Sequence, residues 1–169
     1  MQIKLLICDI DGVFSDGSIY IGNDGEELKT FNTKDGFGIR ALLNNGVDIA
    51  IITGRTSNIV KTRMNSLGVT HIYQGMENKL EGYKQLLKDF NLSPEQVGYI
   101  GDDFPDIPVM KLVGLSVAPG DAHPYVKQIA DLTTTHSGGR GAVRELADLI
   151  VMAQQGEHAI TEQLMGTSA

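Results

Sequence analysis

Two carboxylates follow the first apolar run of the sequence. Asp9 and Asp11 stand directly after residues 3–8, and Gly12 comes next. Because two carboxylates at the end of one strand repel each other, their charge needs compensation, which a hard divalent cation such as Mg²⁺ supplies. The alternative is that both side chains only cap a loop, and their spacing alone does not decide between the two.

The other candidates for chemistry are polar side chains at comparable positions later in the chain: Thr53, Lys79, Asp102, Asp103 and Asp106. Thr53 directly follows one apolar run, the acidic pair follows another after a single glycine, and Lys79 opens a helix-like stretch. Each of these residue types alone has an ordinary structural explanation. Ligands of open α/β sheets gather at the carboxyl ends of the strands, so this order of side chains predicts one shared site.

The elements that must position these side chains are strands and helices in alternation. The strand-like runs are residues 3–8, 47–52, 97–100 and 114–117, and the helix-like stretches are residues 37–44, 57–67, 80–90 and 104–112. Continuously apolar strands are typical of parallel sheets that are covered on both faces. The alternation therefore predicts an α/β fold with an open, mainly parallel sheet flanked by helices.

One segment departs from this alternation. Residues 18–21 and 28–31 are strand-like and flank the turn signal of residues 22–26, which predicts a β-hairpin over residues 17–31, directly after the first strand. We expect a single domain over residues 1–155 and a flexible C-terminal tail over residues 156–169.

Composition and charge exclude several classes of protein. The 169 residues include 14 basic and 21 acidic side chains, a net charge of −7 that argues against binding to nucleic acid or to an anionic membrane surface. No apolar run reaches the roughly 20 residues that a membrane-spanning helix needs. The single cysteine, Cys8, excludes an internal disulfide. We expect a cytoplasmic protein.

The candidate residues together resemble the haloacid-dehalogenase-like phosphohydrolase superfamily. Its four motifs are matched here by Asp9-x-Asp11, Thr53, Lys79 and Gly101-Asp102-Asp103-x-x-Asp106. The resemblance implies that Asp9 attacks phosphorus and forms an aspartyl-phosphate, and that Asp11 first protonates the leaving alkoxide and then activates water.

The same resemblance implies a set of charged partners for the phosphoryl group. Thr53 and Lys79 would hold its non-bridging oxygens. The Mg²⁺ ligands would be the side chains of Asp9 and Asp102 and the carbonyl oxygen of Asp11. Either Asp103 or Asp106 would lie behind them and hold Lys79 or a metal-bound water, and the sequence leaves both possibilities open.

Within this superfamily the chain is most similar to the 3-deoxy-D-manno-octulosonate 8-phosphate phosphatases of lipopolysaccharide biosynthesis. The similarity lies in residues 9–17, 31–39, 52–55 and 138–145. It implies a substrate site formed by Asp11, Asn32, Thr33, Lys34, Asp35, Gly36, Arg40, Arg55, Arg63 and Lys79. Thr33-Lys34 replaces the Val-Arg pair that is more common in that family, so the 9-phosphate of a nonulosonic acid stays an alternative substrate.

Two expectations concern partners and the alternative class of function. Many members of the resembling superfamily carry an inserted cap domain, and here only the hairpin follows the first strand, so the resemblance implies a member without a cap domain. The apolar hairpin and the missing cap predict association with other copies of the chain, and the resemblance implies a homotetramer with hairpins at its interfaces. The loop of residues 138–141, with Arg140, and the tail beyond Gly156 are candidates to cover a site.

The alternative class of protein is a receiver-like signalling domain, which also uses an acidic cluster, a threonine and a lysine. No aspartate stands at the end of the 49–52 strand, where such a domain needs its phosphate acceptor.

Overall fold

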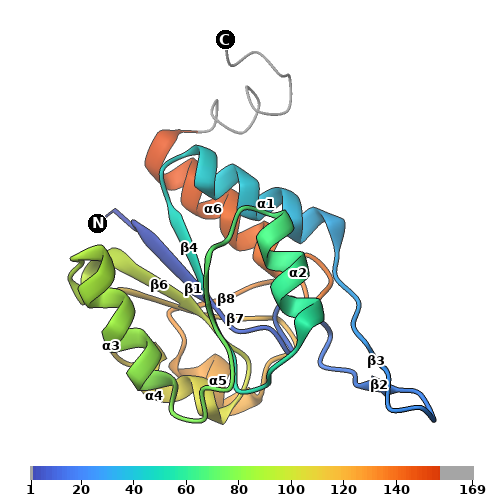
Figure 1. Cartoon of the computed structure of the whole chain (residues 1–169). Helices are drawn as coiled ribbons and strands as arrows, with labels where there is room; N and C mark the ends of the chain where they lie inside the picture. The colour runs from blue at the N-terminus through green and yellow to red at the C-terminus, as the bar shows by residue number, and fades with distance from the viewer. Residues whose placement is uncertain (1, 157–169) are drawn as a thin grey trace.

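A six-stranded parallel sheet in the order β5-β4-β1-β6-β7-β8 forms the centre of the molecule (Figure 1). The computed structural model describes residues 2–156. The strands of this sheet are β1 (Leu5–Cys8), β4 (Asp48–Ile52), β5 (His71–Tyr73), β6 (Val97–Ile100), β7 (Leu115–Ala118) and β8 (Leu132–Thr133). The helices are α1 (Thr33–Asn44), α2 (Asn58–Ser66), α3 (Lys79–Phe90), α4 (Ile107–Met110), α5 (Pro124–Ile129) and α6 (Ala142–Gln155).

The helices form two layers, because the side chains of the central strand alternate between the two faces of the sheet. Leu6 and Cys8 of β1 pack with α1, α2 and α6, whereas Leu5 and Ile7 pack with α3, α4 and α5. All four residues are completely buried. This double coverage explains why β1 is apolar at every position, and it leaves the polar residues to the strand ends.

The start of α1 is fastened to the start of α6 by a buried carboxylate. Asp35 accepts hydrogen bonds from the backbone N–H of Gly141, at 3.3 Å, and of Arg144, at 2.9 Å. Burial raises the pKa of Asp35, and these backbone hydrogen bonds oppose that rise. Gly38 permits the close packing, since a Cβ atom there would lie 3.0 Å from the Ala147 Cβ. Asp35, which was predicted as a substrate residue, is therefore buried and acts as a cap for α6.

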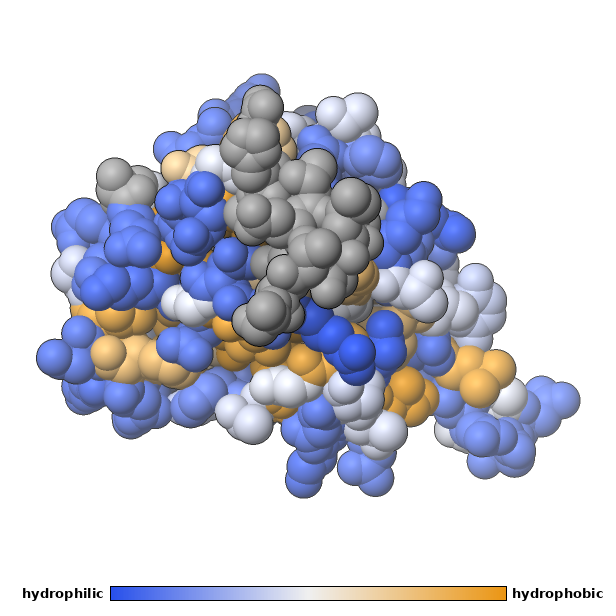
Figure 2. Space-filling view, turned by 90° about the horizontal axis from the view of Figure 1, so that it is seen from above, coloured by the Kyte–Doolittle hydropathy of each residue, from blue (hydrophilic) through white to orange (hydrophobic). Residues whose placement is uncertain are grey.

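The predicted hairpin is present and has one strongly apolar, exposed face. Its strands, β2 (Tyr20–Ile21) and β3 (Glu27–Leu28), pair antiparallel, with Tyr20 opposite Leu28. On this face Tyr20 is 50% exposed and Leu28 is 63% exposed, and Ile21, which lies opposite Glu27, is 67% exposed. Figure 2 shows apolar groups beside the hydrophilic tip of the segment that projects at the right of the view. Within the described chain, this face has no element packed over it.

The predicted fold class and the four predicted strands are confirmed, with strand boundaries that differ from the prediction by at most two residues. The sequence analysis placed the start of the first helix at residue 37, but α1 begins at Thr33 because the Asn32 side chain caps it through the Lys34 N–H. It also missed α5, α6 and β8. No helix among residues 2–156 is long and apolar enough to cross a membrane. Residues 157–169 of the predicted tail lie outside the described residues, and the division into one domain and a tail stays a prediction.

The buried cap generates a prediction about stability. Asp35→Ala leaves the buried N–H groups of Gly141 and Arg144 without an acceptor, so we expect the free energy of unfolding to fall by about 1–3 kcal/mol. Asp35→Asn retains one acceptor oxygen and should lose less. Urea denaturation measures both variants, with Asp48→Ala at an exposed position as the control. Equal stability of Asp35→Ala and the control would show that the cap contributes nothing.

Candidate active site

Three neighbouring strands bring the first predicted catalytic residues to one edge of the sheet. Asp9 directly follows β1, Thr53 follows β4, and Asp102 follows β6 after a glycine. One Asp9 oxygen, Oδ1, accepts the N–H of Ile10 at 2.7 Å, which fixes the orientation of the carboxylate. Asp9 and Thr53 are both buried, whereas Asp102 is partly exposed. The predicted order of polar groups along the chain therefore becomes a cluster in space.

Lys79 joins this cluster from a helix and not from a strand end. It is the first residue of α3, and its Nζ lies 2.8 Å from Asp9 Oδ2 and 2.6 Å from Asp106 Oδ1. The side chain of Lys79 is only 4% exposed. Burial lowers the pKa of Lys79, but Asp9 and Asp106 outweigh it and raise the pKa overall. The ammonium is thus held charged between the two carboxylates.

Of the two aspartates that the sequence left open, Asp106 is the one that holds Lys79. Its other oxygen, Oδ2, accepts the N–H of Asp102 at 3.1 Å and the N–H of Asp103 at 3.2 Å. Asp103 instead caps the 3₁₀ turn Phe104–Asp106 by accepting the N–H of Phe104 at 2.8 Å. Asp106 is therefore a structural link between the loop after β6 and the start of α3.

The acidic side chains form a cluster that suits a metal ion. Asp9, Asp102 and Asp106 offer carboxylate oxygens that all lie within 4.8 Å of one another. Burial, followed by repulsion from Asp106 and Asp9, raises the pKa of Asp102 to about 8. Burial and Asp106 likewise raise the pKa of Asp9 to about 6, although Lys79 opposes the shift. The negative charge is therefore under-compensated, and a divalent cation beside Asp9 and Asp102 would relieve it.

Glycine is required where the loop after β1 meets the loop after β6. A Cβ atom on Gly12 would lie 2.0 Å from Asp102 Oδ2, and the φ of Gly12 is +85°. A Cβ atom on Gly138 would lie 1.8 Å from the carbonyl oxygen of Gly12, so the 138–141 loop packs directly on the loop that carries Asp11. Both contacts keep backbone close to the acidic cluster.

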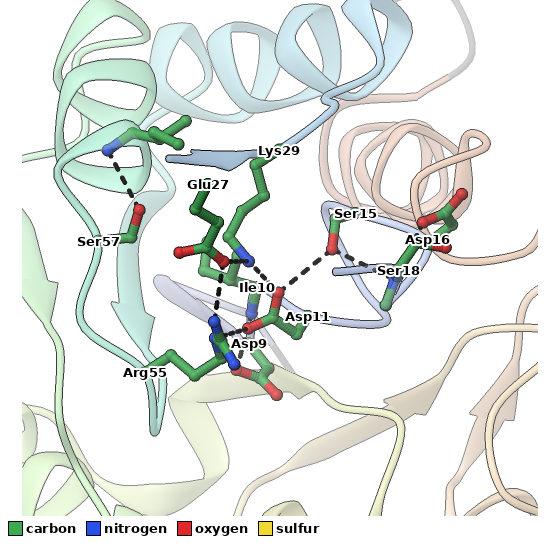
Figure 3. A network of polar contacts seen from close by, with 12 residues as sticks. Asp9, Ile10, Asp11, Ser15, Asp16, Ser18, Glu27, Lys29, Arg55 and Ser57 are labelled. Atoms are coloured by element: carbon green, nitrogen blue, oxygen red, sulfur yellow. Dashed lines mark hydrogen bonds and ion pairs between the residues drawn. The ribbon is translucent and has the colours of Figure 1, made fainter. Parts of the chain in front are cut away.

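Asp11 lies in a second network of charges, shown in Figure 3. Its carboxylate contacts the ammonium of Lys29, which comes from the hairpin, and Arg55 Nε is 3.9 Å from its other oxygen. Arg55 also donates to Glu27 Oε1 at 2.8 Å. The hairpin therefore contributes charged groups to the site as well as an apolar outer face.

The remaining predicted substrate residues do not all meet at the acidic cluster. Lys34 lines a cavity of about 240 Å³ with Arg140, Arg144 and His136. The Asn32 amide is 3.5 Å from the carbonyl oxygen of Gly139, so it contacts the loop at the same end of α1.

A separate cleft of about 270 Å³ between α1 and α2 is lined by Thr33, Gly36, Arg40 and Arg63. Gly36 makes room for Arg63, because a Cβ atom on Gly36 would lie 2.6 Å from the Arg63 Nη2. Arg40 donates to the carbonyl oxygen of Ser66 at 3.1 Å, at the end of α2. The described chain shows no contact between these two arginines and the carboxylates of Asp9 or Asp11.

The sequence analysis missed three residues with contacts in the site. Tyr99, in the middle of β6, is completely buried and donates its hydroxyl to Asp106 Oδ1 at 2.5 Å. Glu27 and Lys29 face Asp11 and Arg55. The alternation Glu27-Leu28-Lys29 at the start of the predicted strand 28–31 was a usable signal, because it places the two charged side chains on one face and Leu28 on the other.

Comparison with known sequences shows close relatives. Residues 68–146 match the family of haloacid dehalogenase-like hydrolases. The chain is 58% identical over 153 residues to the 3-deoxy-D-manno-octulosonate 8-phosphate phosphatase of Yersinia pestis, covering 90% of this chain and 82% of that protein. The enzyme of the same name from Escherichia coli strain K12 is 55% identical, with 90% of this chain and 81% of that protein covered.

Solved structures agree with the sequence comparison. The crystal structure of the Yersinia pestis phosphatase is 56% identical, has a TM-score of 0.91, and aligns over 92% of this chain and 84% of that one. The phosphatase from Moraxella catarrhalis, solved with a magnesium ion, a phosphate ion and a 3-deoxy-D-manno-octulosonate molecule, is 38% identical. Its TM-score is 0.93, with 96% of this chain and 93% of that chain covered.

The raised carboxyl pKa values generate a prediction about metal binding. Below about pH 8 the metal-free Asp102 carboxyl carries a proton, which a bound cation must displace. We therefore expect Mg²⁺ affinity to rise from pH 6 to pH 8, by at most about tenfold per unit for each proton released, and then to level off. Calorimetry at pH 7 in buffers of different protonation enthalpy measures the proton release, and Asp102→Asn should reduce it. An affinity that is constant between pH 6 and pH 8 would contradict this account.

Proposed function

The chain belongs to the 3-deoxy-D-manno-octulosonate 8-phosphate phosphatases, within the haloacid dehalogenase-like hydrolases, and from this membership we propose that it hydrolyses the phosphomonoester of 3-deoxy-D-manno-octulosonate 8-phosphate in lipopolysaccharide biosynthesis. The observation that carries the proposal is the Asp9 carboxylate at the end of β1, oriented by a backbone N–H and 2.8 Å from the Lys79 ammonium. The relative that was solved with magnesium, phosphate and the sugar acid supports both substrate and cofactor.

Asp9 is the nucleophile in this proposal. One of its oxygens bonds to phosphorus, the bond from phosphorus to the sugar oxygen breaks, and Asp11 transfers a proton to the departing alkoxide. In the second step, Asp11 takes a proton from water, whose oxygen attacks the phosphorus of the aspartyl-phosphate. Phosphate leaves, and the Asp9 carboxylate is restored.

The charge of the phosphoryl group is balanced by groups around Asp9. Lys79 and Thr53 hold its non-bridging oxygens, where negative charge is greatest in the transition state. The side chains of Asp9 and Asp102 and the carbonyl oxygen of Asp11 would hold Mg²⁺. This ion, when bound, shields the repulsion between the nucleophile and the phosphate dianion. Asp106 keeps Lys79 in place from behind.

The sugar acid adds a carboxylate to be recognised, and cations near the site suit it. Arg55 beside Asp11, and Lys34 and Arg140 around the neighbouring cavity, offer charged donors to an anionic substrate. Lysine at position 34 gives a point charge in place of a planar fork, which favours no single sugar acid. The same reaction on a nonulosonic acid 9-phosphate is therefore the second candidate.

We further propose that the enzyme is a homotetramer whose hairpins lie at the subunit interfaces. An isolated two-stranded ribbon is marginally stable in water, and this one exposes Ile19, Tyr20, Ile21 and Leu28. We also propose a cytoplasmic location, which the single cysteine of the sequence supports, since disulfides are rare in that compartment.

The test of the reaction is phosphate release from a panel of phosphosugars, with and without Mg²⁺. We expect the highest kcat/KM for 3-deoxy-D-manno-octulosonate 8-phosphate and little turnover without the metal. Asp9→Asn should lower kcat by about a thousandfold or more, since an amide is not an anionic nucleophile. Asp48→Asn, at an exposed position, is the matched control. Faster hydrolysis of a nonulosonic acid 9-phosphate would favour the second candidate, and appreciable turnover by Asp9→Asn would refute the covalent mechanism.

The assembly has its own test in light scattering. The wild-type protein should have the mass of a tetramer at micromolar concentration. Ile21→Asp combined with Leu28→Asp should produce smaller species, because it places charges at two exposed apolar positions of the hairpin. Leu112→Asp, at a partly exposed leucine outside the hairpin, should stay tetrameric. An active monomer of the wild-type protein would refute the assembly.

A further inference from the structure

We propose that Lys29 is a positioning residue for Asp11, and that the hairpin takes part in the reaction by this means. The inference rests on the proposed function, in which Asp11 is the proton donor and acceptor. It adds a requirement for a residue outside the four motifs, 18 positions along the chain from the carboxylate it contacts.

The first observation is the two-sided character of β3 and the residue after it. Leu28 is 63% exposed and faces outward with Tyr20, its partner on β2. The neighbours of Leu28 in the sequence, Glu27 and Lys29, point the opposite way, toward Asp11 and Arg55 (Figure 3). Side chains alternate along an extended chain, and the inward directions of Glu27 and Lys29 on either side of an outward Leu28 agree with this rule.

The second observation is the burial of the Lys29 side chain, which is 1% exposed. A buried ammonium needs charged or polar partners, since its transfer from water is otherwise very costly. Within the described chain, its ion-pair partners are the Asp11 carboxylate and, at 3.7 Å, Glu27 Oε1. An exposed lysine side chain can adopt many rotamers, whereas the buried side chain of Lys29 has little room to adopt another.

The third observation is that the two carboxylate oxygens of Asp11 have different partners. Lys29 contacts Oδ1, and the Ser15 hydroxyl lies 3.5 Å from the same oxygen. The other oxygen, Oδ2, has Arg55 Nε at 3.9 Å, beyond hydrogen-bond distance. Lys29 thus fixes the plane of the carboxylate through one oxygen and leaves the other free for proton transfer to the leaving group.

Glu27 completes the arrangement from the same strand. Its Oε1 accepts from Arg55 Nη2 at 2.8 Å and lies 3.7 Å from the Lys29 ammonium. Glu27 thereby separates two cations that would otherwise crowd Asp11. Because both residues belong to the hairpin, the position of the hairpin sets the orientation of Asp11. The inward charged face of the hairpin thus holds the acid–base residue in place, and contacts on the outward apolar face would fix the hairpin itself.

The test compares two substrates that differ in their need for a proton. Single-turnover rates at excess enzyme are measured with the phosphosugar, whose alkoxide must be protonated, and with p-nitrophenyl phosphate, whose phenolate leaves without a proton. Lys29→Met should slow release of the sugar by about 10–100-fold, part of what general acid catalysis contributes. It should change the single-turnover rate of p-nitrophenolate release by less than about threefold. Lys84→Met, an exposed lysine on α3, is the control for both.

A double-mutant cycle separates positioning from other roles. In an Asp11→Asn background, Lys29→Met should change the sugar-release rate by less than about threefold, because the residue it acts through is already removed. An undiminished effect in that background, or an equal loss on both substrates, would show that Lys29 acts on the phosphoryl group or on folding and would overturn the proposal. So would a Lys29→Met enzyme with wild-type rates.

Two further measurements keep the test decisive. If Lys29→Met does not fold, as judged by circular dichroism, Glu27→Gln provides the second variant. Glu27→Gln should slow sugar release by a smaller factor than Lys29→Met and should leave the rate of p-nitrophenolate release unchanged. Unchanged sugar release in this variant would count against the proposal. A wild-type enzyme that hydrolyses p-nitrophenyl phosphate but no phosphosugar acid would refute the proposed substrate. The Lys29 comparison would then be made on glycerol phosphate or another alkyl phosphate that the enzyme turns over.

Discussion

The buried ammonium of Lys79 balances the negative charge on which the whole site depends. It lies within 2.8 Å of Asp9 and 2.6 Å of Asp106, in a region where carboxylates without a partner would be very costly. The surrounding structure serves this contact. β1 and β6 end at the same edge, α3 begins at Lys79, and Tyr99 and the N–H groups after β6 hold Asp106. The charge that Lys79 does not balance, on Asp9 and Asp102, is what makes the edge suitable for a divalent cation.

The hairpin is the second organising feature, because it combines two chemical characters in a few residues. Its outer face is apolar and exposed, as on surfaces that associate with another protein. Its inner face brings Lys29 and Glu27 to Asp11 and Arg55. In a chain whose described part has no cap domain, the same element can thus face a neighbouring subunit and contact the catalytic carboxylate. Assembly and acid–base chemistry would then depend on one short ribbon.

Much of the fold could be predicted because its signals are local. The apolar runs that became β1, β4, β6 and β7 are short and bounded by polar residues, and the turn of the hairpin is marked by glycine and asparagine. β8 and α5 were missed because they are only 2 and 6 residues long. α6 was missed although Val143, Leu146, Ala147 and Ile150 recur at helical spacing, so its local signal was present and unused. Only its attachment to Asp35, 106 and 109 positions from its partners, has no local pattern.

For the site, the sequence by itself determined which groups reach the edge of the sheet. Asp9, Thr53 and Asp102 follow buried parallel strands, and the ends of such strands must meet. Only the tertiary structure decided the partners of each group: Asp106 and not Asp103 holds Lys79, Lys29 contacts Asp11, and Arg40 and Arg63 lie in a cleft of their own. The physical reason is one of range. Strand ends follow from local polarity and burial, whereas hydrogen bonds and ion pairs require ångström-scale placement, which depends on how all the elements pack together.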